Sequence, residues 1–160
     1  MAWAHAFSTL FVSPFSRLEA SVALPDTRDF PKELKTIGDH IRQARLERNL
    51  LIKDVAALVG VSPWSLHEWE HNHLEPYARK YPRILAFLGY YPFESETLGG
   101  KIKKYRFTHG LTTPEFGKLV GVAGCTVSSW ERNKAKPASK EIASKLDTYL
   151  KTLSNTKAPL

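Results

Sequence analysis

Two stretches of this 160-residue chain decide its fold, and both follow one pattern. Residues 112–131 read TTPEFGKLVGVAGCTVSSWE, and residues 51–70 read LIKDVAALVGVSPWSLHEWE. Apolar residues recur in both at every third or fourth position, which is the period of an amphipathic helix. Gly121 and Gly60 interrupt the two patterns near the middle, where a sharp turn favours a residue without a Cβ. Each stretch therefore predicts two short helices joined by a tight turn.

The repeat extends beyond these stretches. At an offset of 61 residues, residues 37–76 align with residues 98–137 without a gap, and 12 of the 40 positions are identical. Two copies are too few for a solenoid, so we interpret them as tandem copies of one small helical unit. We expect a first unit at residues 33–92, a second unit at residues 93–153 and a tail at residues 154–160.

A further helix precedes each stretch and another follows it. The leading helices are predicted from apolar stripes made by Leu34, Ile37, Ile41 and Ala44 in the first unit, and by Leu98, Ile102 and Tyr105 in the second. The closing helices carry Ile84, Leu85 and Leu88 in one unit, and Ile142, Leu146, Tyr149, Leu150 and Leu153 in the other. The predicted fold is all-α, with about five short helices in the first unit and fewer in the second.

The turns and helix starts show that the two units have diverged. Asn49 and Gly110 follow the leading helices, and both residue types accept a left-handed conformation. Thr112 and Glu115 have the spacing of a capping box, in which a hydroxyl and a carboxylate satisfy free amides. Leu51 stands at the same position of the first unit and has no side-chain acceptor.

The buried side of the second inner helix decides which residues face outward. Leu66 and Trp69, or Val127 and Trp130 in the second unit, are expected to face the core. The residues left facing solvent are Ala123, Gly124, Cys125, Ser128, Ser129 and Arg132 in the second unit, and Ser62, Pro63, Trp64, His67, Glu68 and His71 in the first.

The chain resembles the lambda-repressor-like, xenobiotic-response-element (XRE) family of helix-turn-helix DNA-binding domains. The resemblance lies in residues 45–50 through Trp69-Glu70, and in Arg106 through the sequence SWERNK at residues 129–134, and it spans residues 35–153. It implies that the second inner helix is a recognition helix for the major groove of DNA. It also implies that an arginine of the leading helix pairs with the glutamate that ends the recognition helix. The matching structural pairs are Arg45 with Glu70 and Arg106 with Glu131.

The outward residues of the second unit suit close contact with DNA. Small side chains let a helix approach the base edges, and serine hydroxyls donate or accept hydrogen bonds there. Arg132, Lys134 and Lys136 follow as expected phosphate contacts, and Thr113 stands where the family touches the DNA backbone. In the first unit, Glu68 is unfavourable near phosphates and Trp64 is bulky for a reading position.

Charge separates the units further. The whole chain has a formal charge of +7. Residues 98–137 contain eight basic and two acidic residues, whereas residues 37–76 contain four basic and six acidic residues. DNA affinity should therefore come mainly from the second unit. The first unit either contacts DNA more weakly through Ser62, Trp64, His67 and Glu68, positions the second unit, or presents Trp64 to a protein partner.

These observations predict a sequence-specific, double-stranded-DNA-binding transcriptional regulator of bacterial or phage type, cytoplasmic and associated with the nucleoid. We expect no catalytic step, cofactor, metal or identifiable small-molecule ligand. Two units in one chain suggest reading of two adjacent stretches, or else a homodimer formed through the first unit. An alternative from another class is a protein-interaction adaptor or antitoxin-like partner on the same fold.

Three other features have simpler interpretations. Residues 67–71 read HEWEH and match the zinc-protease pattern H-E-x-x-H, but the aligned residues 128–132 lack both histidines and keep Trp-Glu. Cys125 is the only cysteine, which excludes an intrachain disulfide. Lys101, Lys103 and Lys104 fit a solvated face as well as they fit a contact to the DNA backbone.

The first residues are apolar but do not form a convincing signal peptide. No positive charge precedes Arg17, and Pro14 interrupts the apolar stretch. We expect a mobile N-terminal arm at residues 1–32 and no secretion. No apolar run reaches the roughly 18 residues that a membrane span requires.

Overall fold

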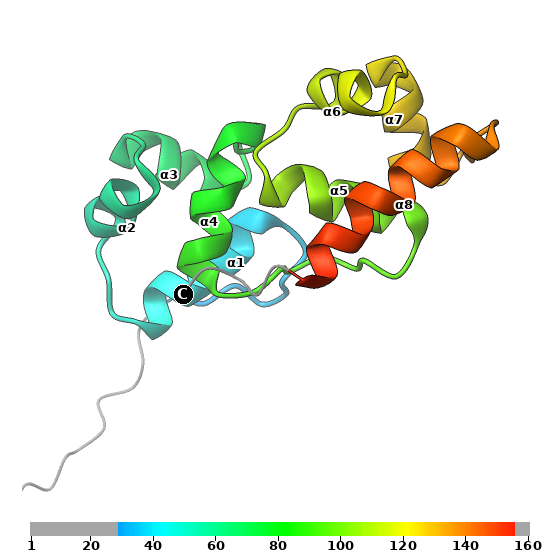
Figure 1. The fold of residues 1–160 in the computed structure, drawn as a ribbon. Coiled ribbons are helices and arrows are strands. Elements are labelled where there is room, and N and C mark those ends of the chain that lie inside the picture. Colours follow the sequence, from blue (N-terminus) through cyan, green and yellow to red (C-terminus); the bar gives the residue numbers. More distant parts are fainter. Residues whose placement is uncertain (1–28, 156–160) are drawn as a thin grey trace, which may run out of the picture.

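The computed structural model describes residues 29–155, with side chains to residue 152. The expected N-terminal arm, apart from residues 29–32, and the expected tail, apart from residues 154 and 155, lie outside the described residues. The described part contains eight α-helices, one 3-10 helix and no strand, which confirms the all-α prediction (Figure 1). In order, they are α1 (Ile37–Glu47), α2 (Ile52–Val59), α3 (Pro63–Glu70), η1 (Ala78–Lys80), α4 (Tyr81–Leu88), α5 (Leu98–Thr108), α6 (Thr113–Val120), α7 (Gly124–Glu131) and α8 (Lys140–Asn155).

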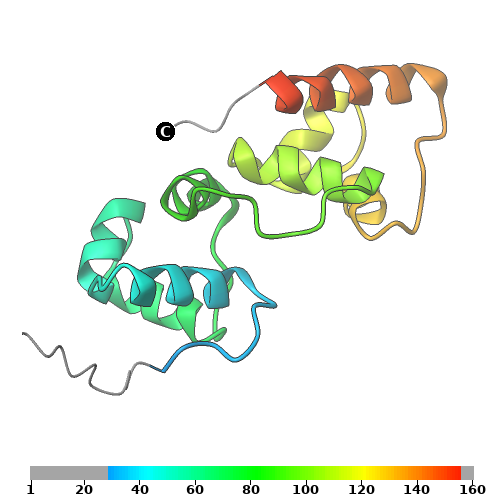
Figure 2. The same ribbon diagram turned by 90° about the horizontal axis from the view of Figure 1, so that it is seen from below.

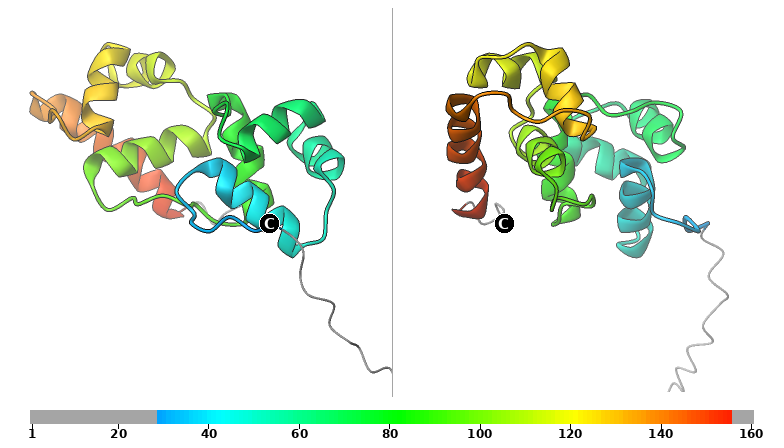
Figure 3. Two further views of the ribbon diagram at one scale, coloured as in Figure 1. Left: turned by 180° about the vertical axis from the view of Figure 1, so that it is seen from behind. Right: turned by 90° about the vertical axis from the view of Figure 1, so that its right-hand side faces the viewer.

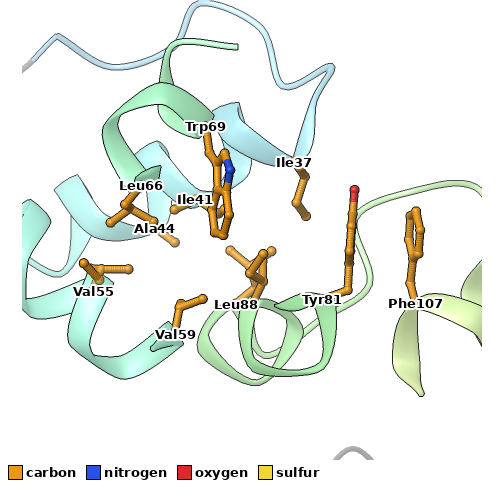
Figure 4. Close-up of a cluster of buried hydrophobic side chains, with 12 residues drawn as sticks. Ile37, Ile41, Ala44, Val55, Val59, Leu66, Trp69, Tyr81, Leu88 and Phe107 are labelled. Atoms are coloured by element: carbon orange, nitrogen blue, oxygen red, sulfur yellow. The ribbon is translucent and has the colours of Figure 1, made fainter. Parts of the chain in front are cut away.

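We call residues 37–88, which hold α1 to α4, the N-terminal segment. Its core is a cluster of aliphatic side chains around Trp69, which is 2% exposed (Figure 4). Ile41, Val55 and Leu66 are fully buried and come from α1, α2 and α3. The apolar period in the sequence therefore places one side of each helix against a common centre.

We call residues 98–155, which hold α5 to α8, the C-terminal segment. A second cluster of buried side chains lies here, with Phe116, Val127 and Trp130 on α6 and α7. Ile102 on α5 and Leu146 on α8 complete it. The expected core positions Leu66, Trp69, Val127 and Trp130 are all buried, as the spacing of the apolar residues predicted.

One residue of the predicted α1 stripe was wrongly placed. Leu34 is 39% exposed and lies before the helix, whereas Ile37 and Ile41 are buried. The helix begins after Thr36 because the Thr36 hydroxyl accepts a hydrogen bond from the Asp39 N–H at 3.1 Å. The Asp39 carboxylate accepts the Thr36 N–H at 2.9 Å in return. This capping box fixes the start of α1 one turn later than the apolar pattern alone suggests.

Two glycines allow the leading helices to approach the ends of α3 and α7. A Cβ at Gly38 would overlap the carbonyl oxygen of Trp69, and a Cβ at Gly99 would overlap that of Trp130. Asn72 and Asn133 follow α3 and α7 with φ values of 60° and 55°, in the left-handed region. Both copies of the repeat have glycine and asparagine at these positions, and only the packing of the helices shows why.

The two segments meet through an aromatic side chain that crosses between them. Phe107 belongs to α5 by sequence, yet it is 7% exposed and forms part of the core of the N-terminal segment. Its ring stacks on Tyr81 of α4, with centroids 3.7 Å apart. Figure 2 shows α4 at this contact, between the other N-terminal helices and α5. A ring from the second expected unit therefore completes the core of the N-terminal segment.

Replacing Gly38 by alanine should destabilise the fold strongly, because the Cβ requires a shift of backbone. We expect a loss of about 3 kcal/mol in the free energy of unfolding, measured by urea denaturation. Gly89→Ala is the matched control, since Gly89 has φ of 84° but no heavy atom near the added Cβ. It should cost about 1 kcal/mol from backbone strain alone. Equal losses for the two variants would contradict the close approach of α1 and α3.

Acid should weaken the fold through His40 on α1. His40 is 8% exposed, and its Nδ1 lies 2.9 Å from the Tyr90 hydroxyl. Burial lowers the pKa of His40 from its ordinary value of 6.5, although Asp39 opposes this shift. The unfolded chain therefore takes up the proton first, and stability present above pH 6.5 is lost as the pH falls towards the folded-state pKa.

His40→Gln removes this titration and keeps a side chain that can bond to Tyr90. The drop in Tm between about pH 7.5 and about pH 5.5 should therefore be smaller in the variant than in the parent chain. An identical drop in both proteins would show that His40 does not contribute.

Candidate nucleic-acid interface

The pair α6 and α7 is set by its caps and by a tight turn. The Thr112 backbone N–H and hydroxyl donate to the Glu115 carboxylate, both at 2.8 Å, which confirms the predicted capping box. These bonds, with the Arg79 guanidinium, lower the pKa of Glu115 to about 2. Gly121 ends α6 with φ of 83°. A Cβ at Gly117 would lie 2.6 Å from the Val122 carbonyl oxygen, so the turn folds closely back on α6.

The outward side of α7 carries small side chains. Ala123 and Cys125 are exposed, and Gly124, Ser128 and Ser129 are partly exposed. Within the described residues, the Ser128 and Ser129 hydroxyls make no hydrogen bond to another protein group, although their carbonyls do. The surface is therefore shallow and offers two hydroxyls for an incoming ligand.

Basic residues surround this surface at the end of α7. Arg132, Lys134 and Lys136 are exposed, and Thr113 at the start of α6 is partly exposed. The Arg132 Nε donates to the Ser128 carbonyl at 3.1 Å, and the Nη1 and Nη2 atoms take no part in this bond. The Lys134 N–H donates to the Ser129 carbonyl at 2.9 Å, so the chain after α7 keeps a defined path.

The corresponding side of α3 is chemically different. Trp64 is 64% exposed, and the Ser62 hydroxyl is used as a helix cap that accepts the Ser65 N–H at 3.0 Å. Glu68 lies between His67 and His73, at 3.3 and 3.4 Å. These contacts therefore hold the Glu68 carboxylate on the outward side of α3. The equivalent position of α7 is Ser129.

A buried ion pair supports each of these surfaces from below. The Arg45 Nε and Nη2 donate to the two Glu70 carboxylate oxygens, both at 2.7 Å. The Arg106 Nε and Nη2 donate to Glu131 in the same way, at 2.7 and 3.1 Å. Each arginine also donates from Nη1 to a backbone carbonyl, of Leu50 or Leu111, at the turn before the next helix. Each guanidinium thus joins the leading helix, the turn that follows it and the last residue of α3 or α7.

The zinc-protease pattern does not assemble a metal site. The rings of His67 and His71 lie 4.1 Å apart, and the His71 Nδ1 donates to the His67 carbonyl at 2.8 Å. Among residues 29–152, no group of three or more His, Cys, Asp or Glu side chains is arranged to hold a metal ion. In the same part of the chain, no helix is long and apolar enough to cross a membrane.

Two of the three α5 lysines take roles that the sequence did not reveal. The Lys103 Nζ lies 5.1 Å from the ring centroid of Phe93 and 5.4 Å from that of Phe107. The Lys104 Nζ lies 5.5 Å from the ring centroid of Tyr91. Both cations thus lie over aromatic rings near the contact of the segments, whereas Lys101 is exposed. The aromatic residues Tyr90, Tyr91 and Phe93 were the available signal, but the sequence does not show which lysine of α5 each ring meets.

One comparison with known proteins is positive. Residues 41–94 match the family model for helix-turn-helix domains of the XRE type, a DNA-binding regulatory family. The match begins within α1, contains α2, α3 and α4, and ends after Phe93. Residues 98–137, the second copy of the sequence repeat, lie outside it. The chain has no match among curated proteins or among solved structures.

Removing one member of the Arg45–Glu70 pair should be costly, because Glu70 is 2% exposed. We expect Glu70→Gln to lower the free energy of unfolding by about 3 kcal/mol, since it leaves a buried guanidinium without its anion. The double variant Arg45→Met with Glu70→Leu should recover most of this loss, because no charge stays buried.

The exposed pair Lys145–Glu141 on α8 provides the control. Glu141→Gln should leave the free energy of unfolding nearly unchanged, because solvent screens that pair. Urea denaturation of all three variants tests the assignment, and a loss for Glu70→Gln no larger than for Glu141→Gln would refute it.

Proposed function

We propose that this chain is a sequence-specific, double-stranded-DNA-binding transcriptional regulator that places α7 in the major groove. One observation carries the proposal, which is the shallow outward side of α7 with basic residues at its end. The helix-turn-helix match of residues 41–94 supports the functional class. We propose that the chain acts at the nucleoid and without a catalytic step.

The proposed reading residues are those that let α7 approach the base edges. Ala123, Gly124 and Cys125 begin the helix with little bulk, and Ser128 and Ser129 lie one turn further on the same side. Hydroxyls that have no protein partner can donate to or accept from bases without losing an existing hydrogen bond. Sequence preference is therefore assigned to α7.

The proposed backbone contacts are cationic or carry a hydroxyl. Arg132, Lys134 and Lys136 lie after α7 and are exposed, and Thr113 lies at the start of α6. Contacts of this kind fix the register of a protein on the duplex and release counterions from the phosphates. They make binding strongly dependent on salt.

We assign α3 a weaker part in DNA binding. The His67–Glu68–His73 contacts hold a carboxylate on its outward side, and Ser62 is occupied as a cap. A carboxylate near phosphates opposes binding unless it accepts from a cytosine amine. Trp64 and His67 are left as the α3 groups suited to touch a groove.

We propose further that residues 33–92 and 93–153 are tandem helix-turn-helix units. The equivalent hydrogen bonds of Arg45 and Arg106 support this organisation, as do the left-handed residues Asn72 and Asn133. In this arrangement a single chain can present two recognition helices.

A second role, in protein association, is favoured by exposed apolar side chains on the N-terminal segment. Trp64 is 64% exposed, Leu58 61% and Leu51 58%. An adaptor, an antitoxin-like partner or a homodimer formed through this segment would cover them. DNA binding by α7 is compatible with such an association.

The variant Ser129→Ala with Arg132→Ala tests the reading surface. It should reduce affinity for a selected duplex by on the order of 10²-fold, because it removes a base contact and a phosphate contact of about 1–3 kcal/mol each. The measurement is a titration by fluorescence anisotropy at several stated salt concentrations.

Lys145→Ala on α8 is the matched control, because it removes an exposed positive charge away from α7. Its affinity should stay close to that of the parent chain. Unchanged binding by the Ser129/Arg132 variant, with the fold intact by circular dichroism, would show that the outward side of α7 does not contact DNA.

A further inference from the structure

We infer that the contact between the two segments holds α3 and α7 at one fixed separation, so that the DNA target is a single composite site with two subsites at one spacing. The inference rests on the proposed function, and it goes further by specifying the form of the DNA. A tandem protein with a flexible linker would instead accept several spacings.

The apolar part of the contact is a stack of buried rings. Phe107 and Tyr81 are 7% and 6% exposed, with a ring-plane angle of 15°. Phe93 packs against Phe107 at a centroid distance of 6.5 Å, and it also meets His40 of α1 at 6.4 Å. Rings from α4, α5 and the intervening loop thus form one packed contact between the segments. Separating them would expose this apolar surface to water.

The cationic part of the contact connects it to the end of α7. The guanidinium carbon of Arg106 lies 4.7 Å from the ring centroid of Phe107, while the same guanidinium donates to Glu131. One side chain therefore touches both the ring that enters the N-terminal core and the last residue of α7. A rotation of α7 relative to the N-terminal segment would have to disturb this arginine.

The start of α6 is tied to the N-terminal segment independently. Arg79 of η1 forms an ion pair with Glu115 at 3.1 Å. Gly110, in the turn before α6, has so little room that a Cβ would lie 3.2 Å from Pro82 and 3.3 Å from the Arg79 Cα. The close approach at Gly110 thus places the start of α6 against the N-terminal segment, and the Arg106–Glu131 pair places the end of α7.

The two recognition helices lie towards the same side of the molecule. In Figure 1, α3 and the pair of α6 and α7 lie on the upper side of the molecule, and the views from behind and from the side in Figure 3 agree. Arg79 of η1 is paired with Glu115, and the Lys80 Nζ donates to the Gly60 carbonyl at 2.6 Å, whereas Arg83 of α4 is exposed. The exposed cation of Arg83 favours a duplex that continues from one recognition helix to the other.

DNA geometry makes the inference testable. Inserting base pairs between two subsites changes their distance, and it also rotates one subsite around the duplex unless a full turn of about 10 base pairs is added. A flexible tandem protein recovers binding after a full turn, because the second subsite again faces it. A rigid one does not, because the subsite is then about 34 Å too far away.

The experiment uses the full chain and a duplex selected from random sequences. The central part of the footprint is lengthened by about 1, 5 or 10 base pairs, and affinity is measured at one salt concentration. We expect a loss of about 10-fold for every insertion, including the full turn, because α7 keeps its subsite and only the weaker contacts of α3 are lost. Recovery of affinity with the full-turn insertion would overturn the inference.

The variant Phe107→Leu tests whether the ring stack causes the fixed spacing. Leucine keeps an apolar side chain in the N-terminal core but removes the stack on Tyr81. The penalty for the full-turn insertion should fall several-fold, and Tyr149→Phe on α8, away from this contact, should keep the full penalty. If Phe107→Leu does not fold, the insertion series on the parent chain decides the question alone.

The remaining outcomes separate this inference from the proposed function. A footprint limited to one subsite, lost in the Ser129→Ala with Arg132→Ala variant, overturns the fixed spacing and leaves DNA reading by α7 intact. Failure to select any sequence from random duplexes overturns the proposed function, and the inference with it.

Discussion

A bidentate arginine–glutamate pair organises the helices of both segments. The guanidinium reaches from the leading helix to the end of the helix two elements later, and its third donor bonds to the carbonyl of the turn between them. The planar fork of arginine suits this task, because it presents several donors in fixed directions. With the pair in place, the leading helix, the turn and the Trp-Glu end of α3 or α7 take one relative position. The outward residues of α3 and α7 then lie on the side of each helix that is opposite to the arginine–glutamate pair.

The sequence predicted the parts of this structure that depend on local rules. The presence of two short helices in residues 51–70 and again in residues 112–131, the Thr112 cap and the turns at Gly60 and Gly121 all follow from spacing and residue type. The start of α1 was missed because the apolar pattern extends back to Leu34, whereas the capping box of Thr36 and Asp39 begins the helix after Thr36. The contact between the segments was also missed. Phe107 occupies an ordinary position in the period of α5, and only the tertiary packing shows that it faces the other core.

The candidate site was predictable in outline and not in its balance of charges. Periodicity placed Ser128, Ser129 and Arg132 on the outward side of α7, and the structure leaves them accessible. It could not foresee that Lys103 lies over Phe93 and Lys104 over Tyr91, because these contacts depend on how the loop before α5 folds back on the helix. Lys103 and Lys104 of the C-terminal segment therefore contribute to packing within the molecule. The exposed basic residues Arg132, Lys134 and Lys136 follow α7 and face solvent.

The position of Phe107 also constrains how the protein forms during synthesis. The core of the N-terminal segment lacks one of its rings until residue 107 has left the ribosome, although α1 to α4 are complete by residue 88. Local contacts can form early, but the last part of this core waits for a helix that belongs to the next segment. The two segments should therefore complete their folding together and behave as one cooperative unit. A protease or a truncation that separates them would leave Tyr81 and Phe107 without their stacking partners.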